Sequence, residues 1–122
     1  MEPRDIARFL AAGRIAFGFG FGLIPERTAP LWLGRIARSP GAIFFCRILG
    51  ARDFVLGAGA MAALSGRGDP RPWILAGAAA DAADLAATVA AREELPPTGY
   101  AVAVATTVGA VALGLLAYRG QS

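Results

Sequence analysis

Six charged side chains interrupt apolar stretches that are otherwise long enough to cross a membrane. Three are basic and three are acidic: Arg14, Arg47, Arg52, Asp53, Asp81 and Asp84. Carboxylates at such a depth carry protons or bind small solutes and ions, whereas guanidinium groups form ion pairs with them. Each charge at the centre of a spanning helix costs about 2.5–3.5 kcal/mol on insertion scales. These residues therefore have to neutralise one another, bind a ligand or take up protons.

The depth of these charges supports that requirement. At about 1.5 Å per residue, all of them except Arg47 fall within about 3 Å of the middle of their stretch. Arg47 lies about 8 Å from the middle by the same count. Its long side chain still reaches toward the others, so the sequence predicts one cluster near mid-membrane.

Polar residues and glycines recur together at the spacing of one helix face. The three faces are Arg14, Gly18 and Gly22 in the first stretch; Arg47, Gly50, Asp53 and Gly57 in the second; and Gly77, Asp81, Asp84 and Thr88 in the third. Only Arg52 is rotated away from its face. Because glycines allow helices to approach closely, these faces are expected to contact other helices rather than lipid.

Arg–Asp pairing is the simplest way to neutralise the set, since a guanidinium fits a carboxylate with two hydrogen bonds. We expect Arg47 to pair with Asp84, because both lean toward the same membrane face in an up-down bundle. Arg14 and Arg52 would then neutralise Asp53 and Asp81. Two interpretations remain open. One is a closed cluster that fixes helix register, and the other is a polar cavity that binds a small solute, an ion or a proton.

The elements that position these residues follow from composition and length. The chain has 122 residues, of which 56% are hydrophobic. Apolar stretches at 6–24, 41–64, 73–91 and 98–118 each match the roughly 20 residues needed to cross a bilayer. We therefore predict a single transmembrane domain, 1–122, with an all-α, up-down four-helix bundle. Residues 26–39 alternate apolar residues with arginines, which predicts a short amphipathic helix at the membrane interface; a plain loop is the alternative.

Missing residue types exclude several kinds of chemistry. The chain contains no His and no Lys, so it has no ordinary zinc or haem ligand set and no lysine for a Schiff base. The single cysteine, Cys46, cannot form an internal disulfide. The net charge is +3, but no arginine cluster interleaved with aromatic residues predicts a nucleic-acid groove. We expect no catalytic residue, cofactor, metal site or nucleic-acid partner.

One segment resembles a known pattern. The run from Arg47 to Gly57, RILGARDFVLG, is followed by Gly77, Asp81, Asp84 and Thr88 at spacings of four, three and four. This arrangement is similar to an uncharacterised branch of the DoxX-like family of small four-helix membrane proteins. The resemblance covers the second and third stretches. It implies a four-helix integral membrane fold and, for the wider family, accessory roles beside oxidoreductases or other membrane proteins. It carries no catalytic residue over to this chain.

The functional expectation follows from the cluster and the missing residue types. We expect a non-enzymatic accessory or interaction protein of the bilayer, with a membrane-protein partner or a second copy of itself. The alternative is a proton-coupled or small-solute transporter that uses Asp81 and Asp84. We expect a bacterial plasma membrane. The N-terminus, second loop and C-terminus carry five arginines against four in the other two loops, which favours both termini in the cytoplasm.

Overall fold

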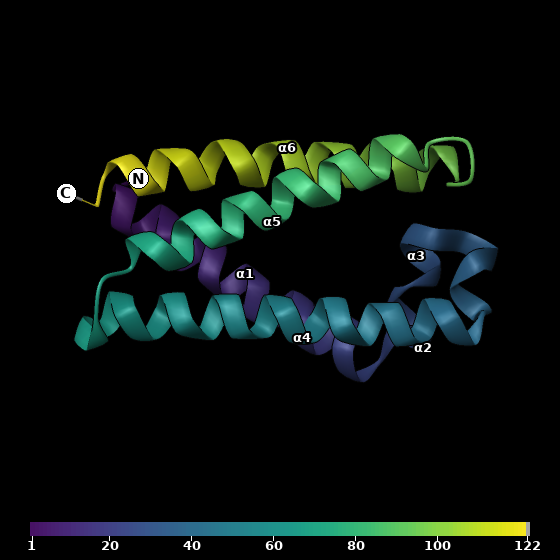
Figure 1. Ribbon diagram of the computed structural model, residues 1–122, viewed down its shortest axis with the longest axis horizontal. Helices are drawn as coiled ribbons and strands as arrows, with labels where there is room; N and C mark the ends of the chain where they lie inside the picture. Colours follow the sequence, from purple (N-terminus) through teal and green to yellow (C-terminus); the bar gives the residue numbers. More distant parts are fainter. Residues whose placement is uncertain (122) are drawn as a thin grey trace.

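The computed structural model describes residues 1–121, and they form a bundle of helices (Figure 1). Four helices are long: α1 (Pro3–Leu23), α4 (Pro40–Ala62), α5 (Arg71–Ala90) and α6 (Pro97–Arg119). The described residues contain no strand. By length and composition, four spans can cross a membrane, and the second extends α4 to Arg67. The predicted all-α four-helix bundle is confirmed.

Proline and small polar residues set the helix ends. Each long helix has a proline at its first or second position, where the missing N–H leaves no bond unmade. Before α4, the Ser39 hydroxyl accepts a hydrogen bond from the backbone N–H of Ala42 at 3.2 Å. After α4, the short turn η2 (Ala63–Arg67) ends the span, with Gly66 at φ 94° and Gly68 at φ 136°. Only glycine adopts these angles readily, which fixes the turn here.

The connection between α1 and α4 is helical but broken into three turns. These are α2 (Pro25–Thr28), α3 (Pro30–Leu33) and η1 (Gly34–Arg38). The loop alternative for residues 26–39 is therefore wrong. Within α3, Leu31 is 84% exposed, whereas the Trp32 ring packs edge-on against Phe21 with ring centroids 5.9 Å apart. The connection thus turns its tryptophan inward.

The four long helices form two close pairs. Helix α1 packs extensively on α4, and α5 on α6, while contacts between the two pairs are sparser. We call the surface where the α1–α4 pair faces the α5–α6 pair the pair interface. It is closed at one end by Ala7, Leu64, Ile74 and Ala117. Toward the other end of the bundle, Ala29 and Ala37 of the connection pack with Cys46 of α4 in a second apolar cluster. The charged residues lie between these ends.

Candidate functional site

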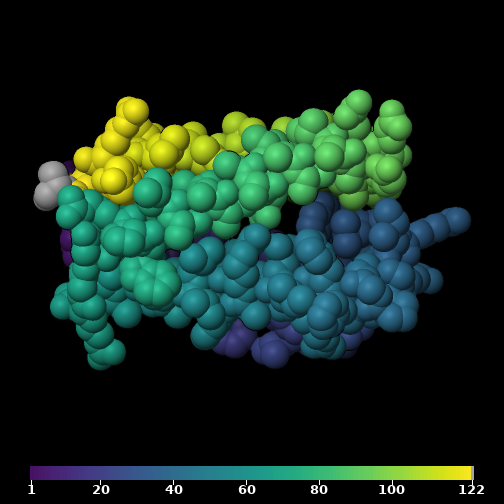
Figure 2. Space-filling view, in the orientation of Figure 1, coloured from purple at the N-terminus to yellow at the C-terminus, as the bar shows by residue number. Residues whose placement is uncertain are grey.

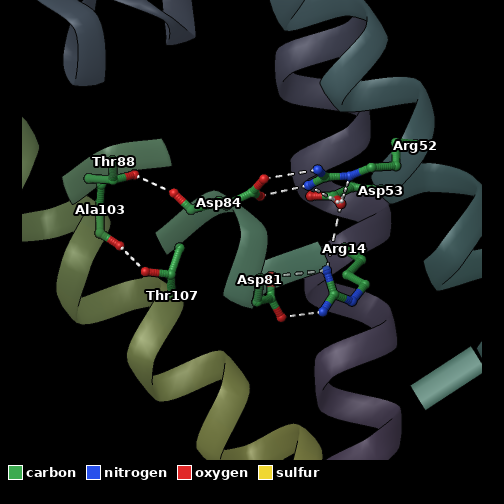
Figure 3. Close-up of polar contacts among 8 residues, drawn as sticks. All are labelled: Arg14, Arg52, Asp53, Asp81, Asp84, Thr88, Ala103 and Thr107. Atoms are coloured by element: carbon green, nitrogen blue, oxygen red, sulfur yellow. Dashed lines mark hydrogen bonds and ion pairs between the residues drawn. The ribbon is translucent and has the colours of Figure 1, made fainter. Parts of the chain in front are cut away.

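Five charged side chains meet in the middle of the pair interface (Figure 3). Helix α1 supplies Arg14, α4 supplies Arg52 and Asp53, and α5 supplies Asp81 and Asp84. We call these five residues the ion-pair cluster. It joins the two helix pairs, because both arginines come from the α1–α4 pair and two of the three carboxylates come from α5.

Two forked contacts cross the interface. Both terminal nitrogens of Arg14 donate to Asp81: Nη1 to Oδ1 at 3.3 Å, and Nη2 to Oδ2. In the same way, Arg52 Nη1 donates to Asp84 Oδ1 at 2.9 Å, and Nη2 to Oδ2 at 2.7 Å. Two-pronged guanidinium–carboxylate contacts of this kind add geometric specificity to charge attraction.

Asp53 links the two contacts into a chain. Its Oδ1 accepts hydrogen bonds from Arg52 Nε at 3.2 Å and Nη2 at 3.1 Å. The same oxygen lies 3.6 Å from Arg14 Nη1. The order across the cluster is therefore Asp81, Arg14, Asp53, Arg52, Asp84.

The cluster is not uniformly buried. The side chains of Arg14, Asp53 and Asp81 are 13%, 9% and 10% exposed, whereas Arg52 and Asp84 are 31% and 30% exposed. The Arg14–Asp81 contact is thus an inner pair and the Arg52–Asp84 contact an outer one. Removing one partner of a well-buried pair leaves an uncompensated charge, so the inner pair is the more sensitive of the two.

Arg47 does not belong to the cluster, so the predicted Arg47–Asp84 pair is wrong. Its Nη1 donates to the Gly22 carbonyl at 2.9 Å, and its Nη2 to Glu26 Oε1 at 3.1 Å. The physical reason is proximity to a helix end. Because Arg47 lies early in α4, beside the end of α1, a free carbonyl and an exposed carboxylate are closer than Asp84. Arg52 forms the ion pair with Asp84 instead, although its position in α4 lies off the polar helix face.

This correction changes the charge balance. The six residues predicted from sequence are formally neutral, but the cluster without Arg47 holds two guanidinium groups and three carboxylates. With all groups ionised, its formal charge is −1.

Thr88 and the glycines have separate roles. Thr88 is buried, and its hydroxyl donates to the Asp84 carbonyl of its own helix at 2.7 Å, so it makes no bond to the charged side chains. A Cβ added to Gly77 would lie 2.8 Å from Arg14 Nη2. Gly77 therefore leaves room for the Arg14 guanidinium to lie on α5, one turn before Asp81.

The other predicted glycines hold α1 against α4. A Cβ on Gly18 would lie 2.7 Å from the Gly50 carbonyl oxygen, and one on Gly57 would lie 2.6 Å from the Ala11 carbonyl oxygen. Gly22 lies beside Gly50 with more room, since its nearest added contact is 3.9 Å. These close backbone contacts are typical of small-residue helix packing in membranes.

Beside the cluster lies a cavity of about 520 Å³ within the pair interface. Figure 2 shows the molecule hollowed between α4 and α5, next to α3. Four members of the cluster line it: Arg14, Asp53, Asp81 and Asp84. The rest of its wall is mainly apolar, with Phe17, Phe21, Leu31, Trp32, Val102 and Ala103 among the lining residues.

Exposed apolar side chains of α1 and α6 also belong to the lining. Phe9 and Val102 both line the cavity, and they are 63% and 60% exposed. The hydroxyls of Thr106 and Thr107 also belong to the lining, but they donate to the carbonyls of Val102 and Ala103 in their own helix, at 2.7 and 2.8 Å.

Sequence reasoning missed the part of this site that α3 supplies. The alternation of apolar residues and arginines predicts that Trp32 lies in the membrane interface, but the structure places it in the cavity wall. Its indole Nε1 is buried and has no acceptor among residues 1–121. Stacked Phe17 and Phe21, with ring centroids 4.2 Å apart, continue the same wall. Their spacing of four residues along α1 was the available signal.

Other kinds of site find less support in the described residues. Among residues 1–121, no three His, Cys, Asp or Glu side chains are arranged to hold a metal ion. Cys46 is buried in the apolar cluster with Ala29 and Ala37 and does not line the cavity. Comparisons with protein-family models, curated proteins and solved structures found no match to this chain. The resemblance to DoxX-like proteins therefore stays a prediction.

Proposed function

We propose that this chain is a non-enzymatic accessory protein of the membrane that holds a small amphipathic molecule between its two helix pairs. The observation that carries the proposal is the cavity, in which ion pairs occupy one part of the wall and aromatic side chains another. Binding sites for small molecules are typically concave, mostly apolar and equipped with a few placed polar groups. A volume of about 520 Å³ lies within the usual range of 300–1,000 Å³.

The ion-pair cluster has a structural part in this function. Sparse packing between the helix pairs leaves the cavity open, so another interaction has to hold the pairs at a fixed distance. The forked contacts from Arg14 to Asp81 and from Arg52 to Asp84 supply it. Buried polar groups are attested as devices that fix helix register. The two interpretations that the sequence leaves open are therefore compatible. The cluster holds the helix pairs together, and it also supplies the polar part of the cavity wall.

The apolar lining supports a ligand that arrives through the bilayer. The exposed residues Phe9 and Val102 belong to this lining and extend its apolar surface. A molecule with an apolar body partitions into lipid and is therefore concentrated around a membrane protein. The accessory role agrees with what the resemblance to DoxX-like proteins implies for the wider family.

The test uses Trp32 as a reporter of occupancy. The chain has two tryptophans, so a Trp73→Phe background leaves Trp32 alone. Reconstituted in phosphatidylcholine nanodiscs, this protein is titrated with 4-(4-bromophenyl)butanol, whose bromine quenches indole fluorescence on contact. We expect saturable quenching, which Ala103→Phe should abolish by filling the cavity.

The matched control is Ala101→Phe, which adds the same ring to an exposed position of α6 outside the cavity lining. It should quench as the Trp73→Phe background does. Quenching that rises linearly with probe in every variant reports only partition into lipid and would overturn the proposal.

A second candidate function is transport of the bound molecule, coupled to protons at Asp81 and Asp84. It is favoured by the position of both carboxylates, which lie at the cavity and near the middle of α5. In liposomes with an imposed pH gradient, wild type would then accelerate probe uptake. Asp84→Asn, at the more exposed of the two carboxylates, would abolish that uptake without unfolding the protein.

We further propose that the protein lies in a bacterial plasma membrane with both termini in the cytoplasm; the arginine distribution among the loops supports this orientation. Cysteines placed at Arg4 and at Arg35, in a Cys46→Ser background, would test this topology. An impermeant maleimide added to whole cells should label the second position and not the first.

A further inference from the structure

The cluster has one carboxylate more than it has guanidinium groups. Asp81 and Asp84 each receive a forked contact from one arginine, and Asp53 is the third carboxylate. The other arginine of α4 that the sequence assigns to the cluster, Arg47, is bound to Gly22 and Glu26. An unbalanced charge inside a membrane protein is costly, so either a positive group or a proton has to neutralise it.

The hydrogen bonds locate the place for that group. Every bond that Asp53 accepts from residues 1–121 goes to Oδ1, and Oδ2 accepts none. The Asp53 side chain is only 9% exposed, and the residue lines the cavity. Oδ2 is nevertheless absent from the fully buried unpaired atoms of the described residues, so it retains contact with open space. The cluster as a whole lacks one positive charge, and Asp53 Oδ2 is a free acceptor on a residue of the cavity wall.

Aromatic side chains form the wall next to the cluster. Trp32 lines the same cavity. The rings of Phe17 and Phe21 lie between this indole and the cluster along α1, and aromatic faces attract cations as well as apolar groups. The wall therefore offers a carboxylate oxygen and aromatic surface.

From this arrangement we infer that the cavity takes a cationic amphiphile, an amine on an apolar ring-bearing body, with its ammonium group on Asp53 Oδ2. The inference rests on the proposed binding function and names its ligand class. The ammonium restores charge balance at three against three and satisfies the free oxygen through a charge-assisted hydrogen bond. A neutral alcohol of the same shape can donate a hydrogen bond to the free oxygen but leaves the charge unbalanced, and an anion adds a fourth negative charge.

The test compares three probes with one body and three head groups: 4-phenylbutylamine, 4-phenylbutanol and 4-phenylbutyrate. Each displaces 4-(4-bromophenyl)butanol from Trp32 in the nanodisc assay at pH 7, where the amine is a cation and the acid an anion. We expect the amine to displace the bromo probe at a concentration at least tenfold lower than the alcohol. The carboxylate should be the weakest of the three.

Asp53→Asn separates charge from shape. The variant leaves two carboxylates for two arginines, and the amide oxygen still accepts from Arg52, so the bundle should stay folded. Its amide N–H₂ replaces the free oxygen, so the amine should lose its advantage over the alcohol. Asp69→Asn is the matched control, because it removes an exposed carboxylate outside the cavity lining and should leave the order of the probes unchanged.

The outcomes distinguish the two proposals. If the bromo probe never saturates, the binding function itself is wrong. If it saturates but the three competitors are equal in wild type, binding stands and the cationic ligand is excluded, and a proton then neutralises Asp53. Should Asp53→Asn fail to fold, the wild-type series still decides.

Discussion

The α1–α4 contact and the pair interface hold the same bundle together by different means. Helices α1 and α4 meet through glycines, with backbone atoms so close that a Cβ at Gly18 or Gly57 would overlap the neighbouring carbonyl. The pair interface has sparser packing, a cavity and five charged side chains. One contact depends on shape and the other on charge.

The difference shows why a cavity can persist in so small a protein. Close packing gives dispersion contacts only where the surfaces touch, so it leaves no room for a void. An Arg–Asp pair spans several ångströms through long side chains and keeps two helices together while holding them apart. The glycine contact holds α1 tightly against α4, and the ion pairs keep the two helix pairs far enough apart to leave a cavity.

We expect the largest loss of stability from a substitution that breaks an ion pair of the cluster. Arg14→Leu leaves Asp81 with no guanidinium and leaves Arg52 to neutralise three carboxylates. We expect a loss of about 3–5 kcal/mol in the free energy of unfolding, the usual cost of removing one member of a buried pair. Steric-trapping or denaturant unfolding in bicelles measures it.

The control for this loss removes both members of the inner pair. Arg14→Leu/Asp81→Leu replaces the contact by apolar side chains, so much of the stability should return. A double variant as unstable as Arg14→Leu alone would mean that Arg14 acts through packing and not through charge.

We expect the next largest loss of stability from a substitution that disrupts the glycine contact between α1 and α4. Gly18→Ala places a methyl group 2.7 Å from the Gly50 carbonyl oxygen and 2.8 Å from the Phe54 backbone nitrogen, so α1 and α4 have to separate. Overpacking of this kind costs about 1–3 kcal/mol. Gly109→Ala is the matched control, because an added Cβ there meets nothing within 4 Å. In the same unfolding assay, equal stability of the two variants would show that the close approach at Gly18 is unimportant.

Much of the frame could be predicted from sequence, because it depends on local signals. Apolar length predicts four spans, and the spacing of Gly18 and Gly22 predicts a close helix contact. The depth of the charges likewise places five of the six in one layer, since rise per residue is nearly constant in a helix.

The pairing and the cavity could not be predicted in the same way. An arginine side chain is long enough to reach several carboxylates. The partners of Arg47 depend on where α1 ends and on the position of Glu26 in α2. The cavity depends on how far the helix pairs stand apart, and no residue type encodes that distance. Trp32 enters the wall only because the connection folds into three turns rather than one helix.

The smallest effect comes from a charge pair outside both contacts, in the turn between α4 and α5. Asp69 accepts hydrogen bonds from Arg71 Nη2 at 2.9 Å and Nε at 3.1 Å, and also from the backbone N–H of Arg71 at 3.0 Å. These side-chain bonds, followed by the backbone bond, lower the pKa of Asp69 below its ordinary value of 3.8. A lowered carboxyl pKa in the folded state contributes stability above the unfolded pKa, and that contribution is lost as the pH falls through the folded pKa.

Arg71→Ala should therefore raise the pKa of Asp69 only part of the way back toward 3.8, because the backbone N–H of residue 71 still donates. Carboxyl ¹³C NMR titration in nanodiscs between pH 2 and 6 measures this shift. Unfolding at pH 7 should be unchanged within error, since both side chains are about half exposed and screened by water. A loss of stability as large as that of Arg14→Leu would contradict the comparison, because a charge outside the pair interface would then contribute as much to the free energy of unfolding as the charges within it.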